Sequence, residues 1–379
     1  MKALSKQQNN LVGDWLPPLV GGFFAWVIFL TLGETPLIRA SGLAVVIVGM
    51  TLALRQMGAI PALAGGLTLA FCPAFWSQTG GSGSLEPGMI ILAIGLTAVF
   101  IIAFIAISKN PYLALGLGFL IFAVIFWSQI STPRSLRLTG LLTVWLLVIL
   151  INSLHTSNPR PGGPPSKQIT SEQYMGLLII LFIGVINDPL FVLLLPTVII
   201  GLWFCHTPLR WWYWTAACTI LVVGIWGFAS YYVDADLWNS SALEAHNQGL
   251  QIKLIIVDGW HEGIRWVDLV GLITSQVTII GVALGILGLA RMARWYPVMG
   301  IVLMLAYMLY AIFGLTYFGN DRSILLMPLF IIQIIWLTYA VHTFGDWLTK
   351  GTNSGINTWR LVTSLYLLLP LYLLLNIEL

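Results

Sequence analysis

The sequence predicts an all-α polytopic membrane protein of about 11–13 transmembrane helices, and three observations favour this fold class. Of its 379 residues, 58% are hydrophobic and only 8% are charged, whereas soluble domains usually carry roughly 25% charged residues. Apolar runs near the ~20 residues that cross a bilayer recur along the chain. The net charge of +3, without a basic run, excludes nucleic acid as a partner. We therefore expect one transmembrane domain over residues 1–379, with membrane lipids as its surroundings.

The predicted spans follow one another with mostly short connections. The first lies behind Lys2 and Lys6 and lacks a small-residue cleavage site, so it is expected to be a signal anchor. The spans are expected at residues 15–32, 41–54, 57–76, 87–107, 111–130, 138–153, 175–187, 189–205, 211–232, 269–290, 297–318, 324–345 and 361–377.

The seventh and eighth spans form one apolar stretch that Pro189 interrupts. Proline removes a backbone donor and disfavours helix in the residue before it, so a break is expected at Asn187-Asp188-Pro189. Asp188 could line a polar cavity at this break. Alternatively, it could cap the following helix, whose first residue would be the proline.

The distribution of Lys and Arg predicts a cytoplasmic N-terminus. With thirteen spans, eleven basic residues fall inside and six outside, which agrees with the positive-inside rule. The outer six are Arg39, Arg134, Arg137, Lys253, Arg265 and Arg322.

Two longer polar segments interrupt the spans. Residues 154–174 contain a Pro/Gly-rich run and are expected to be a cytoplasmic linker. Residues 233–268 form an expected extracytoplasmic loop that contains His246 and His261 as candidate ligand-binding side chains. The sequence shows no metal-ligand spacing and no conventional cofactor motif, so no metal site is predicted and any cofactor stays unknown.

Charged groups at span ends are the remaining candidates for function, because charge near the bilayer is costly. Glu34 could act as a general base, with Arg39 binding a phosphate, or the two could simply pair. Glu86 follows a Gly/Ser-rich segment that could admit a ligand or be a flexible turn. Asp321 and Arg322 could orient and bind a phosphate at the membrane surface. Alternatively, Asp321 caps a helix and Arg322 reaches lipid headgroups.

Four segments resemble, in order, the protein O-mannosyltransferase-like group of the GT-C membrane glycosyltransferases. The similarity extends over residues 41–107 and 175–345. The segments are Phe71-Cys-Pro-Ala-Phe-Trp-Ser-Gln78 with Glu86, Gly184–Pro196, Asn239–Gln251 with Leu287–Arg294, and Asn320–Pro328.

The resemblance implies a GT-C fold and an inverting transfer of sugar from a polyprenyl-phosphate donor to an extracytoplasmic acceptor. On this reading Glu34 is the catalytic base, while Arg39, Glu86, Asp188, Asp321, Arg322, His246 and His261 bind substrate. The chain departs from the family in its first outer loop, which is short and offers Glu34 as the single match to an acidic pair. Asn187-Asp188 also replaces the family's histidine.

These departures favour an alternative class of function. The chain could be a non-catalytic subunit that scaffolds a larger membrane complex with other membrane subunits. A transporter or channel is less favoured, because no internal repeat is visible.

Overall fold

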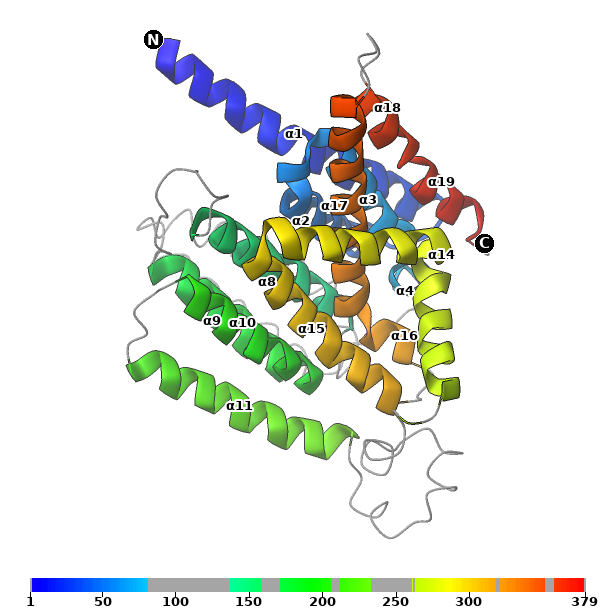
Figure 1. The fold of residues 1–379 in the computed structure, drawn as a ribbon. Helices are drawn as coiled ribbons and strands as arrows, with labels where there is room; N and C mark the ends of the chain where they lie inside the picture. Colours follow the sequence, from blue (N-terminus) through cyan, green and yellow to red (C-terminus); the bar gives the residue numbers. More distant parts are fainter. Residues whose placement is uncertain are drawn as a thin grey trace.

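The computed structural model describes residues 2–80, 136–157, 171–205, 211–232, 261, 263–317, 321–351 and 358–377. All regular elements in these ranges are helices (Figure 1). Within these ranges, seven helices are long and apolar enough to cross a membrane, and four shorter apolar helices accompany them. The chain is thus an all-α, multi-pass membrane protein. The predicted spans at 87–107 and 111–130, with Glu86 and His246, lie outside the described residues.

The helices agree closely with the predicted spans in the rest of the chain. The N-terminal half contains α1 (Lys2–Thr31), α2 (Leu37–Leu54), the short η1 (Arg55–Met57), α3 (Ala59–Phe71), α4 (Pro73–Trp76) and α8 (Leu136–Ser157). The rest contains α9 (Ser171–Asn187), η3 (Pro189–Leu194), α10 (Leu195–Phe204), α11 (Trp211–Tyr232), α14 (Gly263–Trp295), α15 (Pro297–Thr316), α16 (Arg322–Leu325), α17 (Met327–Gly351), α18 (Thr358–Leu365) and α19 (Leu368–Leu375).

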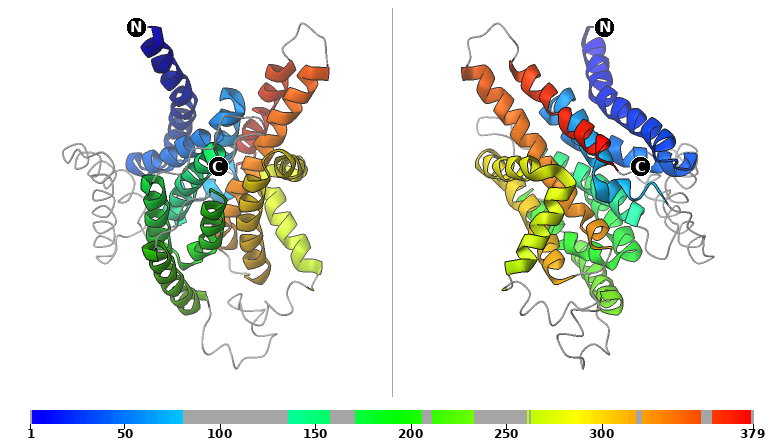
Figure 2. Two further views of the ribbon diagram at one scale, coloured as in Figure 1. Left: turned by 60° about the vertical axis from the view of Figure 1, so that its left-hand side comes forward. Right: turned by 90° about the vertical axis from the view of Figure 1, so that its right-hand side faces the viewer.

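Helix α17 is the centre of the bundle. In the most apolar stretch of α17, 83% of the residues are buried, against 28% for α11 and 22% for the α18–α19 segment. The last two therefore lie at the periphery. Helix α17 packs against α14, α3, α15 and α18. Figure 2 shows α18 and α19 running back along the outside of the bundle, where α18 packs against α17 and α19 packs against α3.

Prolines set three of the observed breaks. Cys72, Asp188 and Tyr296 each have non-helical backbone immediately before a proline that begins the next helix, as the steric restriction on pre-proline residues requires. The predicted break at Asp188 is therefore confirmed. The predicted span 57–76, in contrast, is divided at Cys72 into α3 and α4.

The span predicted at 269–290 lies within α14, which is a candidate membrane span, but this helix is not straight. Helix α14 is kinked at Thr278, which has φ 66° and ψ 162°. Figure 1 shows its first part rising along the edge of the bundle and its second part turning to cross the bundle. This kink contains no proline, and the apolar pattern of the sequence continues through it.

Two predicted loop boundaries are also corrected. Helices α8 and α9 extend to Ser157 and from Ser171, so both ends of the predicted 154–174 linker are helical. Helix α14 begins at Gly263, so the last six residues of the predicted 233–268 loop belong to it. The ends of long membrane helices carry polar residues, because these side chains reach the interface. In the sequence such residues resemble those of a loop, so the helix ends were predicted as parts of loops.

Candidate functional site

The best candidate site surrounds the four residues that follow α4, here called the 77–80 turn. Arg39 in α2 donates from Nη1 to the carbonyl oxygen of Gly80 at 3.2 Å. Arg137 in α8 donates from Nε to the carbonyl oxygen of Gln78 at 3.1 Å. Two half-buried guanidinium groups from helices far apart in sequence thus converge on one short turn.

Gln78 contributes an unsatisfied acceptor to this turn. The residue is 5% exposed, and its Nε2 donates to the Ala74 carbonyl oxygen at 3.4 Å. Its Oε1 is buried without a hydrogen-bond partner among the described residues. A buried polar atom usually has a partner, so Oε1 is suited to receive a hydrogen bond from a bound molecule.

The position of α4 is fixed by two neighbouring helices. The Phe29 ring of α1 packs on the rings of Phe75 and Trp76, with centroids 6.1 and 5.9 Å apart. Gln276 of α14 accepts a hydrogen bond from the Ala74 backbone N–H at 2.7 Å through Oε1. The turn is consequently supported by α1 on one side and by the kinked helix on the other.

Glu34 lies in the connection that follows α1, five residues beyond Phe29. The chain ends α1 tightly, with the Gly33 N–H donating to the Ile28 carbonyl oxygen and the Thr35 N–H to that of Phe29. Glu34 is exposed and has φ 46°, which is uncommon outside glycine. No ion pair joins it to Arg39 among the described residues, and Arg39 instead binds the 77–80 turn.

Helix α16 brings Asp321 and Arg322 to the same region, because it packs against α4. The Tyr317 hydroxyl donates to Asp321 Oδ1 at 2.6 Å, and the Asp321 side chain caps no helix. Burial lowers the pKa of Arg322, Asp268 raises it, and Arg265 lowers it. Arg265 is itself buried and donates to the Leu315 carbonyl oxygen at 3.4 Å.

Asp188 belongs to a different part of the core. It is 1% exposed and its Oδ1 accepts from the Leu190 N–H at 3.1 Å, so it is the predicted helix cap. Next to it, Asn187 donates to Thr139 Oγ1 at 3.0 Å, and the Tyr310 hydroxyl donates to the Leu190 carbonyl oxygen at 3.4 Å. These bonds tie α9, η3, α8 and α15 together.

His261 is exposed and lies two residues before α14 begins. Arg265, four residues after His261 and in the first turn of α14, is buried.

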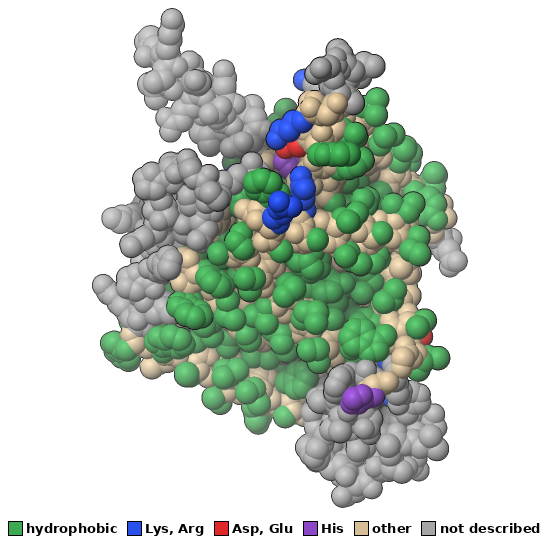
Figure 3. Space-filling model, in the orientation of Figure 1, with side chains coloured by type: hydrophobic (Ala, Val, Ile, Leu, Met, Phe, Trp, Pro, Cys, Tyr) green, Lys and Arg blue, Asp and Glu red, His purple; other side chains and the backbone are tan. Residues whose placement is uncertain are grey.

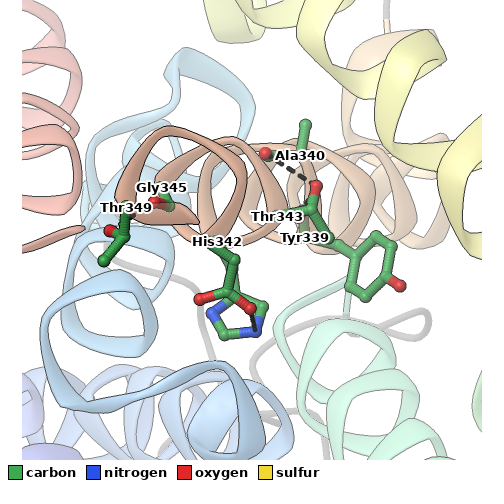
Figure 4. A network of polar contacts seen from close by, with 7 residues as sticks. Tyr339, Ala340, His342, Thr343, Gly345 and Thr349 are labelled. Atoms are coloured by element: carbon green, nitrogen blue, oxygen red, sulfur yellow. Dashed lines mark hydrogen bonds and ion pairs between the residues drawn. The ribbon is translucent and has the colours of Figure 1, made fainter. Parts of the chain in front are cut away.

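A second polar network lies at the opposite end of α17 and has a structural role (Figure 4). His342 Nε2 is 3.8 Å from Asp346 Oδ2, and the His342 ring meets the Trp359 ring edge-on at 6.2 Å. Thr343 Oγ1 donates to the Ala340 carbonyl oxygen at 3.0 Å. Most of these bonds stay within α17, and the Trp359 contact docks α18 on it.

The surface has two kinds of region, an apolar one that is expected to face lipid and one that is rich in basic side chains. Figure 3 shows hydrophobic side chains over α11, α14 and α15, with Lys and Arg side chains gathered where α17 meets α18. Arg291 and Arg294 end α14, Lys350 lies in the last turn of α17, and Arg360 lies in α18. These four are among the basic residues predicted to be cytoplasmic.

Arg137, Gln78 and Arg265 are the site residues that sequence reasoning did not select. Arg137 and Arg39 both begin predicted spans on the same side, which was a usable signal. Gln78 falls inside the segment that resembles the glycosyltransferases, but nothing in the sequence marks its side chain as buried and unsatisfied.

The arrangement can hold an anion that also carries a hydroxyl group. The guanidinium fork matches a phosphate in geometry and charge, and Gln78 Oε1 can accept from a hydroxyl. Comparison of the chain with protein-family models, curated proteins and solved structures finds no match.

Proposed function

We propose that the chain binds a polyprenyl-phosphate sugar at the 77–80 turn and transfers the sugar to a hydroxyl acceptor. The observation that carries this proposal is the convergence of Arg39 and Arg137 on one turn. Two like charges brought together at a half-buried turn repel one another. A phosphate between them converts that repulsion into attraction and suits bidentate binding by arginine.

The neutral part of the site supports a sugar next to the phosphate. Gln78 Oε1 is a buried acceptor without a partner among the described residues, and a sugar hydroxyl would satisfy it. An anion without an O–H group, such as sulfate, would leave this atom unsatisfied, at a cost of about 1–3 kcal/mol.

Glu34 is the base in this mechanism. The acceptor oxygen attacks the anomeric carbon from the face opposite the phosphate, and Glu34 takes the hydroxyl proton. The bond between the anomeric carbon and the phosphate oxygen breaks, and polyprenyl phosphate leaves with the bonding electron pair. Arg39 and Arg137 stabilise the charge that develops on this leaving phosphate.

Binding of a polyprenyl phosphate to the purified protein tests the first half of the proposal. Arg137→Gln is expected to weaken binding by about tenfold or more, which corresponds to ~1.4 kcal/mol. Arg55→Gln, in η1 on the predicted cytoplasmic side, is the matched control and should bind as the unmodified chain does. Equal affinity of the unmodified chain, Arg137→Gln and Arg39→Gln would exclude the 77–80 turn as the phosphate site.

Sugar transfer in proteoliposomes tests the second half. Glu34→Gln keeps the shape of the side chain but cannot accept the proton, so it should bind the donor normally and transfer no sugar. Undiminished transfer by this variant would remove Glu34 from the mechanism. A non-catalytic subunit would show no transfer with either protein.

A further inference from the structure

An apolar groove begins beside the 77–80 turn and leads away from it along the kinked helix. One part, of about 660 Å³, is lined by Pro73, Trp76 and Ser77 of the α4 region together with residues of α14 and α19. A second part, of about 710 Å³, lies between α14, α17 and the α18–α19 segment. Each volume is in the range of small-molecule sites.

The two parts are continuous. Thr278, Ile279 and Tyr372 line both of them. The kink at Thr278 lies where the two parts meet, since Thr278 and Ile279 line both of them, and the second part of α14 turns across the bundle from this point (Figure 1).

The character of the lining changes along the groove. Near the turn it includes the polar side chains of Ser77, Thr274, Ser275 and Asn376. Further away the walls are Leu284, Leu337, Val341, Val362 and other apolar side chains. Tyr366 also lies there, and its hydroxyl is engaged with Thr338 Oγ1 at 3.0 Å, which leaves the ring as an apolar wall.

The groove therefore has the polarity of a lipid, with a more polar end at Ser77, which belongs to the 77–80 turn that the two arginines bind, and apolar walls beyond. Ser77 lies one residue before Gln78, whose carbonyl oxygen binds Arg137. We infer that the groove holds the isoprenoid chain of the polyprenyl-phosphate donor, an inference that rests on the proposed function. The phosphate at the turn and the chain along α14 and α19 then fix the donor at both ends.

Photolabelling of the unmodified protein tests this path without any substitution. The probe is a polyprenyl phosphate with a diazirine on an isoprene unit several units from the phosphate. Labelled peptides are expected from α14, α17 and α18, and unlabelled polyprenyl phosphate should reduce the labelling at least about tenfold. Labelling confined to the shallow apolar groove between α9 and α11, lined by Met175, Phe182 and Trp212 among others, would overturn the inference.

A pair of neighbouring substitutions supplies the second test. Val362 lines the groove, so Val362→Trp fills it from α18. Leu361 is 53% exposed, so Leu361→Trp places the same side chain on the exposed face of that helix. Val362→Trp should lower the affinity for polyprenyl phosphate about tenfold, and Leu361→Trp should leave it unchanged. If Val362→Trp does not fold, Leu284→Trp narrows the groove from the opposite wall with the same expected loss.

The outcomes separate the two proposals. Normal affinity in both groove variants, with weak binding by Arg137→Gln, would overturn the groove and retain the phosphate site. Equal affinity in the arginine variants would overturn the proposed function itself. Labelling of the groove by a diazirine phospholipid that polyprenyl phosphate does not displace would show that an ordinary membrane lipid occupies it, against the inference.

Discussion

The helix breaks at Asp188 and Thr278 both interrupt apolar helices, but they differ in origin and surroundings. Asp188 precedes a proline, is 1% exposed and has extended backbone that any residue adopts. Thr278 has no proline beside it and has φ 66° with ψ 162°, a region that only glycine occupies easily. Ile279 next to it is 75% exposed and lines the groove.

The comparison shows that two breaks in apolar helices can differ in how their surroundings are filled. At Asp188 the N–H and the carbonyl oxygen of Leu190 both have buried side-chain partners, so the break serves packing. At Thr278 the backbone is held in a strained conformation beside an open groove. Strain of this kind persists only when the surroundings enforce it, and it is concentrated at binding sites.

The strongest test of this difference removes the packing that enforces the kink. A Cβ atom at Gly288 would meet the backbone carbonyl of Trp336, so Gly288→Val must separate the second part of α14 from α17. Overpacking against backbone is expected to cost more than about 3 kcal/mol. Thermal unfolding in detergent measures this loss, and Gly271→Val, where a Cβ has open space, is the control that should unfold almost normally.

Asp188→Gly should produce the next largest effect. The substitution removes the acceptor of the Leu190 N–H, and a buried donor without a partner costs about 1–3 kcal/mol. Asp188→Asn keeps an acceptor oxygen and should retain most of the stability. A loss as large in Asp188→Asn as in Asp188→Gly would mean that the carboxylate charge, rather than the cap, stabilises this break.

Tyr310→Phe makes a smaller change at the same break. The hydroxyl donates to the Leu190 carbonyl oxygen at 3.4 Å, and the ring is fully buried. Its removal should lower the free energy of unfolding by about 0.5–1.5 kcal/mol without creating a cavity. No measurable change would show that this bond adds nothing to the cap at Asp188.

Thr278→Gly should give the smallest change in stability and one of opposite sign. Glycine relieves the strained backbone, while the hydrogen bond from the Gly281 N–H to Thr278 Oγ1 at 3.3 Å is lost. The net expectation is a gain of up to about 1 kcal/mol. Thr274→Gly, four residues earlier in regular helix, should instead lose about 0.5–1 kcal/mol. Equal losses at both positions would contradict the strain at Thr278.

The fold was largely predictable because its main signals are local. Apolar runs gave the spans, and Pro189 gave the break at Asp188. The kink at Thr278 could not be predicted, since its causes are tertiary. Gln276 binds the backbone of α4, and Gly281, Gly285 and Gly288 let the second part of α14 approach α17 closely. The three glycines recur at i, i+4 and i+7, a pattern that predicts close packing of one helix face on another, but this pattern does not mark a kink at Thr278.

The candidate site was predictable only in part for the same reason. Arg39 and Arg322 were found because charge at a span end is costly wherever it occurs. Arg137 and Gln78 join them only through the position of the 77–80 turn, which depends on α1 and α14 as well as on α4. The role of Glu34 stays a prediction, since its exposed side chain is placed by a turn and not by contacts with a ligand.

The central claim is that the converging arginines hold a polyprenyl-phosphate lipid, and native mass spectrometry tests it most directly. The protein is extracted from its own membrane in mild detergent, and every retained lipid and co-migrating chain is identified. We expect a polyprenyl-phosphate species on the unmodified protein and its loss from the Arg39→Gln/Arg137→Gln double variant. A stoichiometric complex with other membrane chains and without such a lipid would contradict the claim and favour a scaffolding subunit.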